Sequence, residues 1–89
     1  MYLHLGQEVL IKKSTIIGIF DMDKTTISKR TRNFLTAKEK KNQLINVAAD
    51  LPKSFIVCNR GKEIVVYISQ ISAQTLLKRC SFIKKISYI

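Results

Sequence analysis

The residues best suited to chemistry are two aspartates one residue apart. Asp21 and Asp23 follow an apolar run in the segment IIGIFDMDKTT, which covers residues 16–26. A strand that ends in such a pair can expose one carboxylate as a nucleophile toward phosphorus and the other as a general acid. The pattern raises the hypothesis of a phosphate-transferring hydrolase.

The rest of the chain argues against that hydrolase. Phosphatases of the haloacid dehalogenase type, which the pattern resembles, need a further acidic pair to hold a metal ion and a downstream lysine to clamp the phosphoryl group. After Asp23 the remaining carboxylates are widely spaced and unpaired. The parallel sheet of these enzymes also needs several crossover helices, and this chain has room for at most one. We therefore expect Asp21 and Asp23 to end a buried strand, residues 16–20, and to favour the first turn of the helix that follows.

Other catalytic and metal-binding patterns are absent from the sequence. The single histidine, His4, has no nucleophile near it, and there is neither a GxxxxGK[ST] loop nor a GxGxxG turn to hold a phosphate. Cys58 and Cys80 lack a second cysteine or histidine at zinc-ligand spacing, so we expect free thiols. The sequence predicts a protein that is not an enzyme and has no cofactor or metal.

The elements that position the functional residues are short strands and two helices. A helix is predicted over residues 27–42, capped by Thr25 or Thr26, and a shorter one begins after Ser72. The final segment, FIKKISYI, predicts another strand or a contact with a second subunit. The fold class is α+β, with a small antiparallel β-sheet, one central basic helix and a short C-terminal helix. Strands are predicted over residues 2–5, 9–11, 16–20, 44–48, 55–58 and 63–69, with a hairpin turn in the segment NRGK.

The charge of the chain is strongly positive. Sixteen Lys and Arg accompany six Asp and Glu in 89 residues, which gives a formal net charge of +10 and an attractive field for polyanions. Between Lys24 and Lys41 there are seven basic residues and one acidic residue, whereas solvent-exposed helices usually intersperse opposite charges. Apolar runs are far shorter than the ~20 residues needed to span a bilayer, and no signal peptide is visible. We expect a single cytoplasmic domain without a membrane partner.

Nucleic acid is the default partner for this charge. Basic residues on predicted turns accompany those of the central helix, so loops and helix together can follow a phosphate backbone. The sequence has no helix-turn-helix, zinc finger or RNP aromatic pattern, which favours backbone recognition by several subunits over base-specific contacts. The nominated contact residues are Lys12, Lys13, Lys29, Arg30, Arg32, Lys53, Arg60 and Lys62.

With these elements placed, the chain resembles the RemA/RemB family of small bacterial extracellular-matrix regulators, and within it the RemB branch. The segments that carry the resemblance are MYLHLG, IIGIFD, RNFL, DLPKSFIV and SQISAQTLLKR, in this order from Met1 to about Arg79. Residues 80–89 form a tail outside it. The resemblance implies a DNA-binding activator of biofilm matrix genes, a compact α+β fold similar to LytTR-type DNA-binding domains, and a homo-oligomeric ring with a basic rim that wraps DNA.

The chain departs from the RemA branch at two places. Thr15 stands where that branch has an arginine before a strand, and Leu51-Pro52 stand where it has an arginine pair, while Arg79 matches the closing helix and joins the nominated contacts. The leading hypothesis is a non-enzymatic, DNA-binding transcriptional regulator that acts as a homo-oligomer and has no small-molecule substrate. The alternatives are a protein-interaction or assembly module that binds an acidic protein, and an RNA-binding protein.

Overall fold

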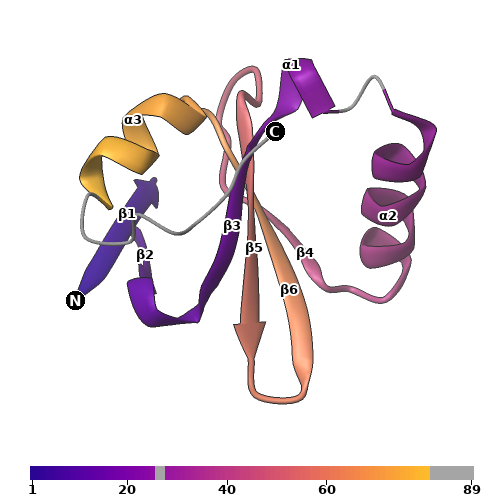
Figure 1. The fold of residues 1–89 in the computed structure, drawn as a ribbon, viewed down its shortest axis with the longest axis horizontal. Coiled ribbons are helices and arrows are strands. Elements are labelled where there is room, and N and C mark those ends of the chain that lie inside the picture. Colours follow the sequence, from indigo (N-terminus) through magenta and orange to yellow (C-terminus); the bar gives the residue numbers. More distant parts are fainter. Residues whose placement is uncertain (26–27, 81–89) are drawn as a thin grey trace.

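A computed structural model describes residues 1–25 and 28–80 and arranges their elements in three layers (Figure 1). A four-stranded sheet lies in the middle, a two-stranded hairpin and a C-terminal helix cover one face, and a longer helix covers the other. The predicted α+β class is confirmed. The elements are β1 (Tyr2–Gly6), β2 (Val9–Lys12), the 3-10 turn η1 (Lys13–Thr15), β3 (Ile16–Asp21), α1 (Met22–Thr25), α2 (Lys29–Lys40), β4 (Leu44–Asn46), β5 (Ser54–Arg60), β6 (Glu63–Ser69) and α3 (Ala73–Arg79).

The prediction of one antiparallel sheet is corrected in two ways. β1 and β2 form a separate two-stranded sheet, and the larger sheet has the order β3-β5-β6-β4, with β4 parallel to β6. Because β5 is antiparallel to both β3 and β6, strands β3 and β4 run in the same direction at opposite edges. Helix α2 connects them across one face. A crossover helix of this kind carries the chain from the end of one strand back to the level at which that strand began. The next strand, β4, therefore runs parallel to β3.

Alternating side chains give the central sheet two apolar faces. On β5, Ile56 and Cys58 belong to the larger core, which β1, β2 and α3 complete. Phe55 and Val57 point to the other face and form a smaller core under α2. There the ring of Phe20 stacks on that of Phe55, with centroids 5.0 Å apart. Helix α2 contributes no fully buried residue to this second core, so it is held far less firmly than α3.

The predicted strands are present, with changes in extent. β6 has the predicted bounds, but β5 continues to Arg60, so that the hairpin turn is Gly61-Lys62 with a positive φ of 72° at Gly61. β4 is shorter than predicted and ends at Asn46. Ile17 was predicted to be buried and is 51% exposed, because a register shift between Ile16 and Gly18 turns it out of the ladder.

Both predicted helices are present, and the bounds of the longer one are shifted. α2 spans 29–40 and its N-cap residue is Ser28. Of the two predicted caps, Thr25 is the last residue of α1 and Thr26 lies outside the described residues, as does the segment 82–89. The single turn α1, which carries Asp23, separates β3 from α2. α3 begins where predicted, since the Ser72 hydroxyl oxygen accepts a hydrogen bond from the Thr75 N–H at 3.2 Å. None of the helices in the described part of the chain is both long and apolar enough to cross a bilayer.

A Schellman motif ends α2 and directs the chain into β4. The Asn42 N–H donates to the Glu39 carbonyl at 3.1 Å, and the Gln43 N–H donates to the Lys38 carbonyl at 2.9 Å. Asn42 has a φ of 59°, the left-handed conformation that this motif requires. The motif therefore fixes the direction in which the basic helix joins the sheet.

Candidate nucleic-acid interface

Helix α2 presents a basic surface that contributes little to the core. Lys29, Arg30 and Arg32 are exposed in and beside its first turn, where no acidic residue stands. Lys40 and Lys41 are exposed at its other end. The N–H groups at a helix N-terminus carry a partial positive charge, so the first three side chains add to the local positive potential instead of offsetting it. We call these five residues the basic helix surface.

The attachment of α2 to the sheet leaves this surface in solvent. Thr31, Leu35 and Lys38 are its half-buried residues, at i, i+4 and i+7, and Leu35 packs against the smaller core. By the helical period, Lys29 and Lys40 lie on the side opposite these three residues. The sequence prediction of a basic, exposed helix is confirmed.

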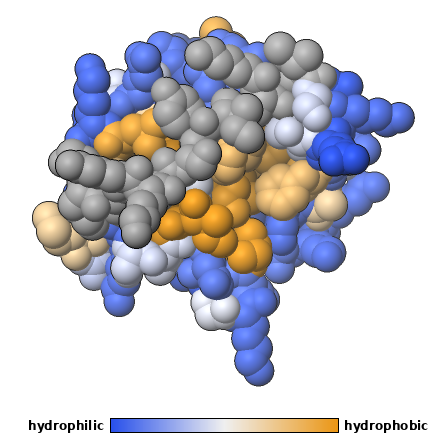
Figure 2. Space-filling view, in the orientation of Figure 1, coloured by the Kyte–Doolittle hydropathy of each residue, from blue (hydrophilic) through white to orange (hydrophobic). Residues whose placement is uncertain are grey.

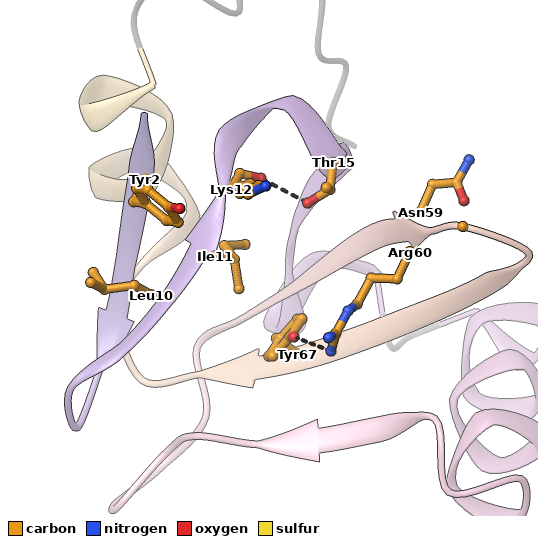
Figure 3. Close-up of a pocket in the computed structure, with 9 residues that line it drawn as sticks. Tyr2, Leu10, Ile11, Lys12, Thr15, Asn59, Arg60 and Tyr67 are labelled. Carbon is orange, nitrogen blue, oxygen red and sulfur yellow. Dashed lines mark hydrogen bonds between the residues drawn. The ribbon is translucent and has the colours of Figure 1, made fainter.

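A second basic group lies where the β1–β2 hairpin meets the β5–β6 turn. Lys12 ends β2, Arg60 ends β5, and Lys62 stands in the turn, and all three side chains are exposed. Lys12 and Arg60 line a cavity of about 360 Å³ (Figure 3). The Nη1 of Arg60 donates a hydrogen bond to the hydroxyl of Tyr67 at 3.2 Å. We call Lys12, Arg60 and Lys62 the hairpin-end group.

The side chain of Lys13 is buried inside the fold. Its side chain is only 9% exposed, and its Nζ donates to the carbonyl oxygen of Arg79 at 2.9 Å. Lys13 occupies the inward position two residues after the buried Ile11, so the alternation of β2 continues through it. We therefore assign Lys13 a structural role, in contrast to the surface contact predicted from its charge.

The remaining nominated residues lie apart from both groups. Lys53 is exposed before β5, at the strand end opposite Arg60, and Arg79 is exposed at the end of α3. Helix α2 lies on one flank of the sheet, and the hairpin and α3 lie on the other (Figure 1). Hydrophilic side chains form most of the outline of this view, while apolar side chains gather near its middle (Figure 2). The nominated residues thus occupy several separate regions of the molecule.

The carboxylates and thiols form no metal centre within residues 1–25 and 28–80. Asp21 ends β3 and Asp23 stands in α1, as the structural interpretation of the pair predicted. Cys58 and Cys80 are buried free thiols. Burial raises the pKa of the Cys58 thiol to about 11, while a hydrogen bond with Thr15 and the charge of Arg60 lower it by smaller amounts.

Sequence reasoning missed the uncharged residues of the cavity. Tyr2, Thr15, Asn59 and Tyr67 line it beside the two basic residues. Tyr2 stands directly opposite Lys12 in the β1–β2 register, which the alternation of the two strands could have indicated. The approach of the β5–β6 hairpin is a tertiary contact that no local pattern reports.

The fold and these exposed surfaces define a class, a small α+β protein that displays positive charge on a loosely packed helix and at a hairpin end. The family model described as "RemA-like: Extracellular matrix regulatory protein A-like" matches residues 2–80. Extracellular matrix regulatory protein B of Bacillus subtilis (strain 168) is 34% identical over 86 residues, which cover 97% of this chain and 98% of that protein. The chain belongs to the RemA-like family, and the predicted resemblance, including that to its B-type member, is confirmed.

Proposed function

We propose that this chain is a non-enzymatic transcriptional regulator of extracellular matrix and biofilm genes. It binds the phosphate backbone of duplex DNA as a cytoplasmic homo-oligomer, with a protomer similar to LytTR-type domains. The observation that carries the proposal is the basic helix surface in a member of a family named for extracellular matrix regulation. Membership supports the regulatory role, and the charge supports the choice of ligand.

The placement of charge on α2 favours a polyanion as the partner. A cation near a helix N-terminus is unfavourable by roughly 0.3–1 kcal/mol, and Lys29, Arg30 and Arg32 stand near that end together. A bound phosphate backbone offsets the unfavourable positive charge at this end of the helix. Its binding also releases counterions from the DNA. The helix therefore becomes more stable in the complex than in the free protein.

Repetition of the protomer supplies the number of contacts that one copy lacks. A few phosphate contacts give weak, salt-sensitive binding, and linking several copies raises the effective affinity. β3 and β4 are the edge strands of the larger sheet, and Ile17 and Ile45 on these strands are 51% and 37% exposed. Exposed edges with apolar side chains are suited to pairing between subunits.

Fluorescence anisotropy with duplex DNA over a salt series tests the proposal. The variant with Lys29→Gln, Arg30→Gln and Arg32→Gln should bind all sequences more weakly, and its plot of log K against log salt should flatten by about 0.9 per lost contact. Lys78→Gln, on the exposed face of α3, is the control and should have less than about one third of that effect. Wild-type protein that does not bind DNA at low salt contradicts the proposal.

Two further measurements distinguish DNA from the other two classes of partner, an acidic protein and RNA. A pull-down that recovers the same partners after nuclease treatment indicates an acidic protein. Competition in which duplex RNA displaces duplex DNA at equal concentration indicates RNA as the ligand, since the backbone charge is common to both.

A further inference from the structure

The cavity beside the hairpin-end group has the charge of an anion site. Nine described residues line it, and among them are two cations, Lys12 and Arg60, and no carboxylate (Figure 3). The two cations come from different hairpins, so the packing of the hairpins against each other creates the site. An anion between them is attracted by both charges.

The guanidinium of Arg60 is held in place by the fold. Its Nη1 donates to the hydroxyl of Tyr67, whose side chain is only 6% exposed. A guanidinium has five N–H donors, and this hydrogen bond uses one of them. The planar group can therefore present a paired set of donors to a phosphate, for which its geometry is well suited.

The β1–β2 side of the cavity offers an exposed tyrosine and an exposed leucine. The ring of Tyr2 is 56% exposed and Leu10 is 59% exposed, both on the outer face of the β1–β2 hairpin. An exposed aromatic ring next to a phosphate-binding cation is the arrangement on which nucleic-acid bases stack. Asn59 adds a carboxamide to the lining, which can bind a sugar or a base edge. The Thr15 hydroxyl donates to the Lys12 carbonyl oxygen at 2.7 Å, so toward a ligand it can only accept.

The size of the cavity limits the ligand. Its volume of about 360 Å³ lies near the lower end of the range of ~300–1,000 Å³ for small-molecule sites. It accommodates one phosphate, one sugar and one base. We propose that the cavity binds a nucleoside monophosphate, with the phosphate between Lys12 and Arg60 and the base against Tyr2.

This site is separate from DNA binding by α2. The cavity lies between the β1–β2 hairpin on one flank and the turn end of the central β5–β6 hairpin, whereas α2 lies on the opposite flank (Figure 1). A phosphate beside a planar base also occurs at the end of a nucleic-acid strand, so the shared chemistry has two sources. The measurements below distinguish them.

Calorimetric titration of the full chain with AMP tests the ligand class. AMP should bind, and adenosine and ribose 5-phosphate, which lack the phosphate and the base respectively, should each bind at least about tenfold more weakly. Ribose 5-phosphate or inorganic phosphate that binds as tightly as AMP overturns the proposal, because the aromatic surface then contributes nothing. No heat of binding with any of the four common monophosphates overturns it as well.

Three variants of lining residues and one control variant test the placement. Arg60→Gln should weaken AMP binding at least about tenfold and Tyr2→Ala several-fold, while Lys78→Gln, with the same loss of charge on α3, should change it less than about twofold. The side chains of Arg60, Tyr2 and Lys78 are all exposed, and thermal unfolding verifies that each variant is folded. Lys12→Gln provides a second cation variant. AMP affinity equal to that of the wild type in both Arg60→Gln and Lys12→Gln refutes the site.

A 5′-phosphorylated trinucleotide separates the two sources. Similar affinities for AMP and the trinucleotide, with amide shifts at Asn59 and Gly61 in nuclear magnetic resonance spectra, support the free nucleotide as occupant. A trinucleotide that binds at least about tenfold more tightly, with a difference that Arg60→Gln abolishes, replaces the free nucleotide by a strand end. The α2 variant with three glutamines should bind AMP as the wild type does, so failure of DNA binding leaves this result unaffected.

Discussion

The ammonium group of Lys13 lies 2.9 Å from the carbonyl oxygen of Arg79, and this hydrogen bond joins the β2–β3 connection to the end of α3. The last carbonyls of a helix have no intrahelical donor, so a cation at this place satisfies one of them and favours the negative helix end. The two residues are 66 positions apart in the sequence. Lys13, whose charge predicts a surface position, thus links two elements through its hydrogen bond.

Replacement of Lys13 by methionine should lower the free energy of unfolding by about 1–3 kcal/mol, because the carbonyl loses a charged donor while the aliphatic volume is kept. Lys12→Met is the matched control, since its side chain is exposed, and should stay within about 0.5 kcal/mol of the wild type. Urea unfolding measures both. Equal effects of the two substitutions contradict the structural role of Lys13.

Local sequence patterns were sufficient for the elements with strong signals. The sequence predicts β6 with its bounds because a run of β-branched and aromatic residues follows a turn with Gly61, and it predicts α3 because Ser72 supplies the N-cap. The direction of β4 was beyond such patterns. It depends on the path of α2 across the sheet, which no window around residues 44–46 contains.

The candidate site divides in the same way. The charge of α2 follows from the composition of one continuous segment, so the sequence alone indicates Lys29, Arg30 and Arg32. The alternation of inward and outward residues from Ile11 to Lys13 indicates that Lys13 is buried. The cavity could not be predicted, because its lining combines two hairpins whose contact is set by packing of the core.

The raised pKa of Cys58 predicts a loss of stability at alkaline pH. The unfolded thiol releases its proton near its usual pKa of 9.0, whereas the folded thiol holds it to about 11 because burial disfavours the thiolate. The contribution is therefore complete below pH 9 and is lost as the pH rises toward 11. Between pH 8 and 10 the wild type should lose about 1 kcal/mol more than Cys58→Ala in urea unfolding. Parallel pH curves for the two proteins would refute this assignment.

The turn between β1 and β2 predicts a stabilising substitution. Gln7 and Glu8 have φ values of 47° and 65°, a two-residue turn of the type that favours glycine and asparagine. A side chain in this region is strained by roughly 1 kcal/mol, so Glu8→Gly should raise the free energy of unfolding by up to about that amount. Thermal unfolding at constant protein concentration provides the measurement.

The opposite change at the β5–β6 turn is the control. Gly61 has a φ of 72°, and a Cβ added there meets no atom within 4 Å. Gly61→Ala should therefore lower stability by about 1 kcal/mol through the backbone alone. If Glu8→Gly and Gly61→Ala change stability in the same direction, backbone strain does not explain either turn.

Charge reversal at the two ends of α2 should change the stability of the helix in opposite directions while lowering DNA affinity at both. Lys29→Glu and Arg30→Glu place negative charge at the positive end of the helix, so each should stabilise α2 by about 0.3–1 kcal/mol while DNA affinity falls. Lys40→Glu makes the same change at the negative end and should destabilise the helix with a similar loss of affinity. Amide hydrogen exchange of Leu35 and Ala37 reports the stability of α2, and anisotropy reports DNA binding. If the exchange rates shift in the same direction for Lys29→Glu and Lys40→Glu, the helix dipole does not determine the stability of α2. If the DNA affinities of these variants equal that of the wild type, α2 does not contact DNA.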